Sequence, residues 1–512
     1  MRKTLVLAVL AGLAACGDES TTSKVAPAAA ADVATTPPVS ETSAAISDIV
    51  WGGTEPGITP FIAFVNLRGQ ELAQVRGVSY SIQPKPGSVS KAVRVSYTRE
   101  ALESRGRIPA DDELVLPVFG LYSDYSNSVS IELSFEDCSS QTIEGTVTTA
   151  VYTDPTGAYA NPVFIRNRAA GSELGFDFFA MKSGSGTPVV VDTDGAIRWV
   201  GVSNESSISS AFTDNGFVIG DQRSTRLWRL ELDGTVTPAS FAAPSNYRRF
   251  HHNIDPGKTG LLAEFDTFTD RETTINEFTW TGGYFKEWDF VKIVTDHLTG
   301  AGDDPSLLVR PSVDWFHTNA AVYDARDDSL IVSAREHFVI NVDYDTGAIR
   351  WVLGDPTKYW YSFPSLRAKA LTLTSGLYPI GQHALSITSD GLLLLFNAGQ
   401  PSENQPAGAP IGEARSYSAV SAYRIDAATM TATEVWNFDY GKTLFSDHCS
   451  SAYEAAGKSL LVTFSRADNL RYARVVGLNS DHEVVFDFQY PARFCSTAWN
   501  SVPIPFDDMK FM

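Results

Sequence analysis

The stretch "AAVYDARDDSLIVSAR" (residues 320–335), with "INVDYDTGAIRWVLG" (residues 340–354) close behind it, carries the pattern that decides the fold. In each stretch, apolar and polar residues alternate on both sides of a short polar turn, which is the pattern of a β-hairpin. Two hairpins in succession form a four-stranded antiparallel unit. The sequence therefore predicts one such unit between residues 320 and 354.

Copies of this unit fill most of the chain. The second hairpin occurs six times: "VVVDTDGAIRWV" (189–200), "LWRLELDGTVT" (227–237), "FTWTGGYFKEWDF" (278–290), "INVDYDTGAIRWVLG" (340–354), "YRIDAATMTATEVWNF" (423–438) and "VVGLNSDHEVVFDF" (475–488). A hairpin of the first kind precedes most copies, and the sequence shows no helical periodicity between the units. Six four-stranded units favour an all-β fold with a six-bladed β-propeller over a solenoid or a sandwich.

A different kind of β-domain is expected before the propeller. Residues 48–160 contain strand-like runs such as "AVRVSYT" and "SVSIELSFED", separated by Gly, Pro, Asn and Asp. This pattern predicts a small N-terminal β-sandwich. The propeller is expected to occupy residues 161–512, because a chain of this length exceeds a single core.

The first residues predict export. "MRKTLVLAVLAGLAAC" has two basic residues, a short apolar run and small residues before Cys16, the pattern of a secretory signal. Because "LAAC" resembles the lipobox of bacterial lipoproteins, residues 1–16 are interpreted as a lipoprotein signal peptide with Cys16 as the lipidated residue. Residues 17–47 are rich in Ala, Thr, Ser and Pro, as in a disordered tether. The expected location is the bacterial cell envelope, with a lipid anchor on the periplasmic face of the outer membrane.

Charge and cysteines narrow the function further. The formal net charge of −20 argues against nucleic-acid binding, which needs a basic face. Outside the cytoplasm one disulfide is reasonable, and Cys449 with Cys495 is the pair that we expect, since both fall in the last part of the repeat array. Ordinary thiols are the alternative.

Four of the eight histidines recur in one register of the repeat. His252, His317, His383 and His448 are 65, 66 and 65 residues apart, and each stands at the start of a first hairpin. In a blade the beginning of the innermost strand lies beside the end of the second strand, which carries Arg335 in one unit and Arg466 in another. These six side chains are therefore expected at one rim of the central channel. The adjacent His251 leaves a one-residue ambiguity.

Two chemistries suit such a rim. Four imidazoles around an axis can bind a metal, as in a propeller oxygenase. The two guanidinium groups oppose an uncompensated cation and fit a tetrahedral oxyanion better, because Arg offers a planar fork of donors. Asn319 and Asn397 also lie near the rim, where they either orient histidines or make ordinary turn and strand-end hydrogen bonds.

Several motifs carry a family resemblance: "HHN", "DWFHTN" with "SAR" after it, "GQH", and "FGLYSDYSNSVSIELSFED" in the first domain. With these motifs the chain resembles the bacterial arylsulfate sulfotransferases, six-bladed propellers with an N-terminal β-sandwich. The resemblance implies transfer of a sulfuryl group from a phenolic sulfate ester to a phenol, without a nucleotide sulfate donor, cofactor or metal. It also makes a homodimer a reasonable expectation.

The resemblance assigns roles by motif. His383 of "GQH" is expected to be the nucleophile that forms a sulfohistidine in a ping-pong mechanism. His317 and Arg335 are expected to hold the sulfuryl oxygens, and His252 to bind the sulfuryl group or transfer protons. His448 and Arg466 belong to the pocket only through their place in the repeat. A four-histidine metal-dependent oxygenase and a non-catalytic propeller that binds an anionic ligand or a partner protein are the alternatives.

Overall fold

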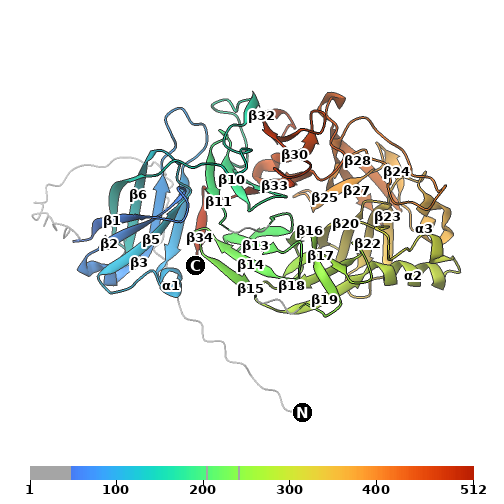
Figure 1. Cartoon of the computed structure of the whole chain (residues 1–512), viewed down its shortest axis with the longest axis horizontal. Helices are drawn as coiled ribbons and strands as arrows, with labels where there is room; N and C mark the ends of the chain where they lie inside the picture. Colours follow the sequence, from blue (N-terminus) through green and yellow to red (C-terminus); the bar gives the residue numbers. More distant parts are fainter. Residues whose placement is uncertain (1–47, 203–205, 240–242) are drawn as a thin grey trace, which may run out of the picture.

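The computed structural model describes residues 48–202, 206–239 and 243–512. Strands dominate these residues, as Figure 1 shows, and the all-β prediction is confirmed. The predicted signal peptide (1–16) with Cys16 and the predicted tether (17–47) lie outside the described residues.

Six sheets of four or five strands follow one another along the chain, and we call them blades 1 to 6. Blade 1 contains β9 (Phe178–Lys182), β10 (Val189–Asp192), β11 (Ile197–Val200) and β33 (Asn500–Ile504). Blade 2 contains β12 (Ser210–Thr213), β13 (Gly216–Gly220), β14 (Leu227–Glu231) and β15 (Val236–Ala239). Blade 3 contains β16 (Tyr247–Pro256), β17 (Leu261–Thr267), β18 (Thr274–Phe278) and β19 (Tyr284–Asp289). Blade 4 contains β20 (Thr318–Asp324), β21 (Ser329–Ala334), β22 (Phe338–Asp343) and β23 (Ile349–Leu353). Blade 5 contains β24 (Thr372–Ser375), β25 (Gln382–Ile387), β26 (Leu393–Asn397), β27 (Ala419–Asp426) and β28 (Thr431–Phe438). Blade 6 contains β29 (Ser451–Glu454), β30 (Leu460–Ala467), β31 (Tyr472–Leu478), β32 (Val484–Pro491) and β8 (Val163–Arg166).

The blades form a closed ring. An apolar core lies between each pair of neighbouring blades, and one such core joins blade 6 back to blade 1. The aromatic residues that end the repeated hairpins contribute to these cores, since Trp199, Trp288 and Phe486 are buried. Burial of both faces explains why the strands of blade 4 are almost continuously apolar.

Chain ends close the ring and tie it to the first domain. β33 pairs with β9, so a strand from near the C-terminus is the innermost strand of blade 1. The next strand, β34 (Met509–Phe511), lies beside the N-terminal domain (Figure 1) and pairs in parallel with its strand β4 (Val93–Thr98). The hairpin pattern did not indicate this return, because β34 has no hairpin partner beside it in the sequence.

The N-terminal domain contains two sheets that share one apolar core with blades 1 and 2. One sheet has β1 (Val50–Pro56), β2 (Ile62–Arg68) and β5 (Glu113–Phe119). The other has β34, β4 (Val93–Thr98), β3 (Val75–Ile82), β6 (Ser126–Phe135) and β7 (Ser140–Thr148). The short helices of this domain are η1 (Gln70–Gln74) and α1 (Arg99–Ser104).

One helix contradicts the expectation that the connections lack helical periodicity. α2 (Phe290–Gly300) joins blades 3 and 4 and is capped by Asp289, whose carboxylate accepts hydrogen bonds from the next turn. Its buried residues Phe290, Val294 and Leu298 recur at a helical spacing that the overlapping strand pattern obscures. The remaining short helices are η2 (Pro305–Leu307), η3 (Tyr359–Ser362), α3 (Pro364–Arg367), η4 (Tyr440–Lys442) and η5 (Ala456–Lys458). Within the described part of the chain, the helices are all too short or too polar to span a bilayer.

Candidate active site

The inner strands bend where they carry the register histidines. The strand register shifts between His251 and Ile254 in β16, at Thr318 in β20, and between His383 and Ser386 in β25. Backbone φ angles are positive at His252 (40°), His317 (57°) and Ala384 (52°), which is rare for residues with a Cβ. Such irregularities redirect side chains away from the regular alternation of a strand.

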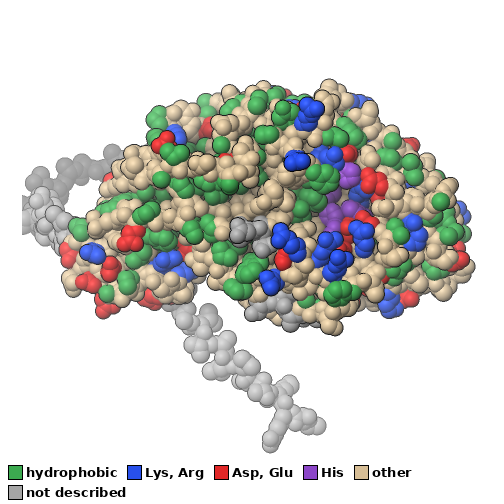
Figure 2. All heavy atoms as spheres, in the orientation of Figure 1, with side chains coloured by type: hydrophobic (Ala, Val, Ile, Leu, Met, Phe, Trp, Pro, Cys, Tyr) green, Lys and Arg blue, Asp and Glu red, His purple; other side chains and the backbone are tan. Residues whose placement is uncertain are grey.

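Three of the four register histidines meet there. The ring centroid of His252 lies 4.7 Å from that of His317 and 5.5 Å from that of His383. Trp499, just before β33, packs on the same group, with its ring centre 5.3 Å from His252 and 5.8 Å from His383. Figure 2 shows histidine side chains at one place on the surface, flanked by basic and acidic groups. The predicted convergence is thus observed for these three residues.

His383 has a defined tautomer. Its Nδ1 lies 3.1 Å from the backbone carbonyl oxygen of Ser450, so Nδ1 carries the proton and donates it. Burial, together with the positive charges of His317 and Arg335, lowers the pKa of His383 to about 3. The ring is therefore neutral, and Nε2 keeps its lone pair.

His317 is in the opposite state. Its Nδ1 lies 2.6 Å from Oε2 of Glu272 and 2.7 Å from Oδ2 of Asp314. Burial alone would lower the pKa of His317, but the two carboxylates outweigh it and raise the pKa to about 10. His317 is therefore an imidazolium ion next to two neutral histidines, since burial and the neighbouring histidines hold the pKa of His252 well below its usual value.

The ambiguity between His251 and His252 is resolved by position. His252 is buried and faces His317, His383 and Trp499, whereas the Nε2 of His251 lies 2.7 Å from Oε1 of Glu272. The Nδ1 atoms of the two rings contact each other. His252 is thus the residue that contacts the other two histidines, whereas His251 contacts His252 and Glu272.

Arg335 closes the other side of the site. Its backbone N–H donates to the carbonyl oxygen of His317, so the two ends of the hairpin are paired as the repeat predicts. Its Nη1 lies 2.9 Å from Oε1 of Glu336 and its Nη2 lies 3.1 Å from Oε1 of Glu403. Arg335 is buried and holds a fixed positive charge beside the histidines.

His448, the fourth of the histidines that recur in the repeat, contacts Arg335 rather than the cluster of His252, His317 and His383. We call the part of the site formed by Arg335, His448 and Arg466 its basic side. The Nε2 of His448 lies 3.4 Å from Nη2 of Arg335 and 3.2 Å from Oε1 of Glu403, and its Nδ1 lies 3.2 Å from Asp447. Arg466 approaches Nδ1 of His448 at 3.3 Å and pairs with Asp447. Burial opposes the charge of His448, but hydrogen bonds to Asp447 and Glu403 raise its pKa.

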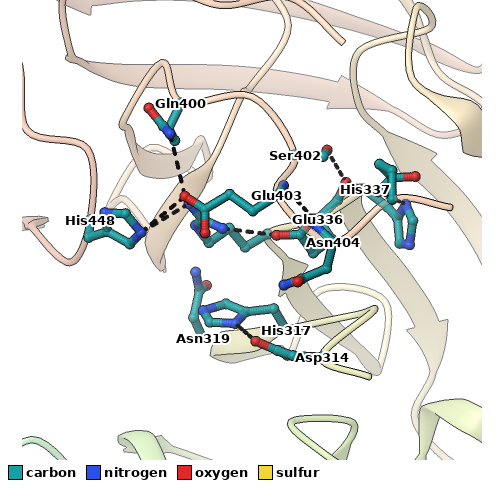
Figure 3. A network of polar contacts seen from close by, with 12 residues as sticks. Asp314, His317, Asn319, Glu336, His337, Gln400, Ser402, Glu403, Asn404 and His448 are labelled. Atoms are coloured by element: carbon teal, nitrogen blue, oxygen red, sulfur yellow. Dashed lines mark hydrogen bonds and ion pairs between the residues drawn. The ribbon is translucent and has the colours of Figure 1, made fainter. Parts of the chain in front are cut away.

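The two asparagines differ in their contacts. Asn319, which Figure 3 shows beside His317, is fully buried and donates from Nδ2 to the carbonyl oxygen of Gln382, the residue before His383. It links the two strands that carry His317 and His383. The Oδ1 of Asn397 accepts a hydrogen bond from the backbone of Ile380, a strand-end contact.

A disulfide joins two segments that border the site. Cys449 and Cys495 are joined, which connects the residue after His448 to the segment that leads to Trp499. Ser450, whose carbonyl oxygen fixes His383, donates its own backbone N–H to Trp499. The disulfide therefore holds together two segments that orient the nucleophile candidate.

Sequence reasoning missed the acidic residues of the site, Glu272, Asp314, Glu336, Glu403 and Asp447, as well as Trp499. Asp314 and Asp447 lie beside the motif histidines, so their proximity was a usable signal. Glu272 and Glu403 lie in connections between strands, where no periodicity marks them.

Two groups of side chains have the spacing of a metal site: His251, His252 and Glu272, and Glu272, Asp314 and His317. Both differ from the four-histidine set, because they need the carboxylate of Glu272 and leave out His383 and His448. Carboxylate and imidazole ligands can bind divalent cations. In the structure the same carboxylate instead neutralises the imidazolium of His317.

Comparisons with known proteins give one consistent family. The arylsulfotransferase (ASST) family model matches residues 160–500. A curated arylsulfate sulfotransferase AssT from Escherichia coli O6:H1 is 30% identical over 153 residues, which is 27% of this chain and 24% of the relative. The enzyme of that name from Lelliottia amnigena is 24% identical over 206 residues, or 32% of this chain and 33% of the relative. The matched segments thus span a third or less of these relatives.

Solved structures are more distant. A β-propeller domain of Cps50 (Swd1) from Myceliophteria thermophila has a TM-score of 0.35 and 14% identity, and covers 65% of this chain and 89% of its own. A protein of unknown function from Bacteroides thetaiotaomicron has a TM-score of 0.34 and 10% identity, and covers 86% and 98%. Both TM-scores are low, so neither structure informs the site.

Proposed function

Because this chain belongs to the arylsulfotransferase family, we propose that it transfers a sulfuryl group from an aryl sulfate ester to a phenol by way of a sulfohistidine at His383. The observation that supports this most is the state of His383, a buried neutral imidazole whose Nδ1 donates to Ser450. A nucleophilic histidine needs a free lone pair on the attacking nitrogen, and Nε2 has it.

In the first half-reaction, Nε2 of His383 attacks the sulfur atom, an N–S bond forms, and the bond between sulfur and the aryl oxygen breaks. The departing phenolate takes a proton from His317, the histidine that is held protonated. In the second half-reaction, neutral His317 takes the proton of the acceptor phenol, whose oxygen attacks sulfur while the N–S bond breaks. His317 suits both steps, because its pKa of about 10 matches that of a phenol.

In this proposal Arg335 holds the sulfuryl oxygens, as the motif predicts, and His252 takes the place beside it that the motif gave to His317. Negative charge is spread over these oxygens in a loose transition state, as in phosphoryl transfer. A fixed, buried guanidinium group lowers the energy of such a state, and one donor of this kind is worth roughly 3 kcal/mol. The paired carboxylates Glu336 and Glu403 keep Arg335 in position without covering all of its donors.

The proposed reaction is tested with purified protein, 4-nitrophenyl sulfate, and phenol added or left out. We expect release of 4-nitrophenol that accelerates with phenol, formation of phenyl sulfate, and a mass gain of about 80 Da on the protein. The variant His383→Ala should show neither release nor mass gain. The variant His482→Ala is the matched control, because His482 stacks on Trp436 in an outer hairpin.

Other outcomes separate the alternatives. Release that does not respond to phenol would indicate a sulfatase that uses water as the acceptor. No release, together with stoichiometric iron or zinc in the purified protein, would favour the oxygenase; no release without metal would favour a binding protein.

We also propose that the protein acts outside the cytoplasm, anchored by a lipid on Cys16. The secretory pattern of residues 1–16 and the disulfide between Cys449 and Cys495 support this location. Labelling of bacterial cells with a radioactive fatty acid should mark the wild-type protein and leave the variant Cys16→Ser unlabelled; labelling of both would refute the anchor.

A further inference from the structure

A carboxylate occupies the basic side of the site. Glu403 lies in the connection between β26 and β27, and Figure 3 shows its carboxylate directed toward His448. The Oε1 atom of Glu403 lies 3.1 Å from Nη2 of Arg335 and 3.2 Å from Nε2 of His448. Gln400 donates to the same oxygen at 3.4 Å.

The backbone of this connection is fixed from below. The backbone N–H groups of Glu403 and Asn404 donate to Oε2 of Glu336 at 2.9 and 2.8 Å. The hydroxyl of Ser402 donates to the carbonyl oxygen of Glu336. Glu336 is fully buried and is also bonded to Arg335. The backbone that carries Glu403 is therefore fixed, and its carboxylate is held by Arg335 and His448.

Glu403 also keeps its charge. The hydrogen bond from His448 and the positive charge of Arg335 lower its pKa to about 2, although partial burial opposes this. Other charged groups near this part of the site include Arg466 and Asp447, which pair with each other, Glu336, and the buried Lys358, whose Nζ lies 3.3 Å from the carbonyl oxygen of Glu336. Arg335 and His448, the two cations that Glu403 contacts, also contribute to the lowered pKa of His383.

We propose that Glu403 sets the charge of the substrate, so that the site accepts monoanionic sulfate esters and rejects dianionic phosphate monoesters. This inference rests on the proposed sulfuryl transfer and deepens it. Aryl sulfates and aryl phosphates share a tetrahedral group of the same shape, so shape alone cannot separate them, and contacts by cationic Arg and His side chains alone would favour the dianion. A fixed negative charge can, because its repulsion of a dianion is about twice its repulsion of a monoanion.

Binding is compared for three probes at pH 8, where a phosphate monoester, with a second pKa of about 6, is dianionic. The probes are 4-nitrophenyl sulfate, 4-nitrophenyl phosphate, and methyl 4-nitrophenyl phosphate, a diester with one charge. With Glu403 intact we expect the two monoanions to bind more tightly than the dianion. In Glu403→Gln the affinity for the dianion should rise about tenfold more than that for either monoanion, since the partly exposed charge acts through screened electrostatics.

Two controls separate charge from structure. Glu403→Asp keeps the charge and should keep the preference, whereas Asp447→Asn removes a carboxylate on the far side of His448 and should change the ratio less. Equal changes for all three probes in Glu403→Gln, or a loss of the preference in Glu403→Asp at unchanged thermal stability, would overturn the proposal. All affinities are measured in the His383→Ala background, in which the proposed transfer cannot occur, so failure of the transferase assay is seen separately from failure of this inference.

Discussion

His383 and His317 are chemically identical side chains that the structure holds in opposite protonation states. Burial and nearby cations keep His383 neutral, while the carboxylates of Glu272 and Asp314 keep His317 charged. An ordinary histidine has a pKa near 6.5, so neither state follows from residue type. In the proposed mechanism this difference lets His383 act as the nucleophile and His317 as the proton donor.

The pH dependence of the first half-reaction should reflect these two states. Below a pH of about 3, protonation of His383 removes the attacking lone pair, and above a pH of about 10, loss of the proton from His317 removes the acid. We expect kcat/KM for 4-nitrophenyl sulfate to be nearly flat from about pH 5 to about pH 9. The profile is measured from initial rates at limiting donor; a titration near pH 6.5 would contradict the assigned states.

Glu272 should control the alkaline end of that profile. Glu272→Gln removes a charge 2.6 Å from Nδ1 of His317, so the pKa of His317 should fall, and activity should be lost at lower pH than in the wild type. At pH 9 we expect kcat/KM to fall by about one to two orders of magnitude, a part of the ~10²–10⁴-fold that a general acid contributes. Asp314→Asn should act in the same direction and less strongly.

Glu272→Asp is the matched control, because it keeps the charge with a shorter side chain. It should retain the alkaline limit better than Glu272→Gln. If Glu272→Gln lowers activity equally at every pH, Glu272 merely supports the fold around His251, and the role of His317 as the acid would need revision.

At the level of elements, the strands were predictable and the connections were not. The alternation that identifies a hairpin is local, so all six outer hairpins were located from sequence, and the spacing of His252, His317 and His383 followed from the repeat. Glu272 and Glu403 come from connections of irregular length, where position depends on tertiary contacts. His448 has the position in the repeat that the sequence predicted, but its ring contacts Arg335 and Arg466 rather than the other histidines. Its ion pairs with Asp447 and Glu403 hold it there.

The disulfide links two such connections, and its removal tests how much they matter. The bridge spans 46 residues, and a loop of that length corresponds to about 4 kcal/mol of stabilisation in the chain-entropy model. The double variant Cys449→Ser/Cys495→Ser should therefore unfold at clearly lower urea concentration. Because Ser450 and Trp499 lie in the joined segments, kcat for aryl sulfate should fall as well. An unchanged urea midpoint would show that the blade cores alone hold these segments.

At the scale of the whole molecule, the chain closes on itself twice. β33 completes blade 1 and so closes the ring that positions the histidines, while β34 completes a sheet of the N-terminal domain. Neither pairing has a local signal, since the partners β9 and β4 lie hundreds of residues earlier in the chain. Fold closure thus depends on a short segment that sequence periodicity could not assign.

Deleting residues 505–512 should separate these two functions of the C-terminal segment. The deletion removes Phe506, Met509 and Phe511, which are buried against the N-terminal domain, where Phe511 stacks on Tyr97. Each such side chain contributes about 1.5–3 kcal/mol by burial, so the N-terminal domain should unfold at much lower urea concentration. Since β33 and Trp499 remain, release of 4-nitrophenol at 25 °C should persist near the wild-type rate. Phe511→Ala should lower the urea midpoint less. Loss of activity at unchanged stability would instead mean that the N-terminal domain shapes the site directly, through its shared core with blades 1 and 2.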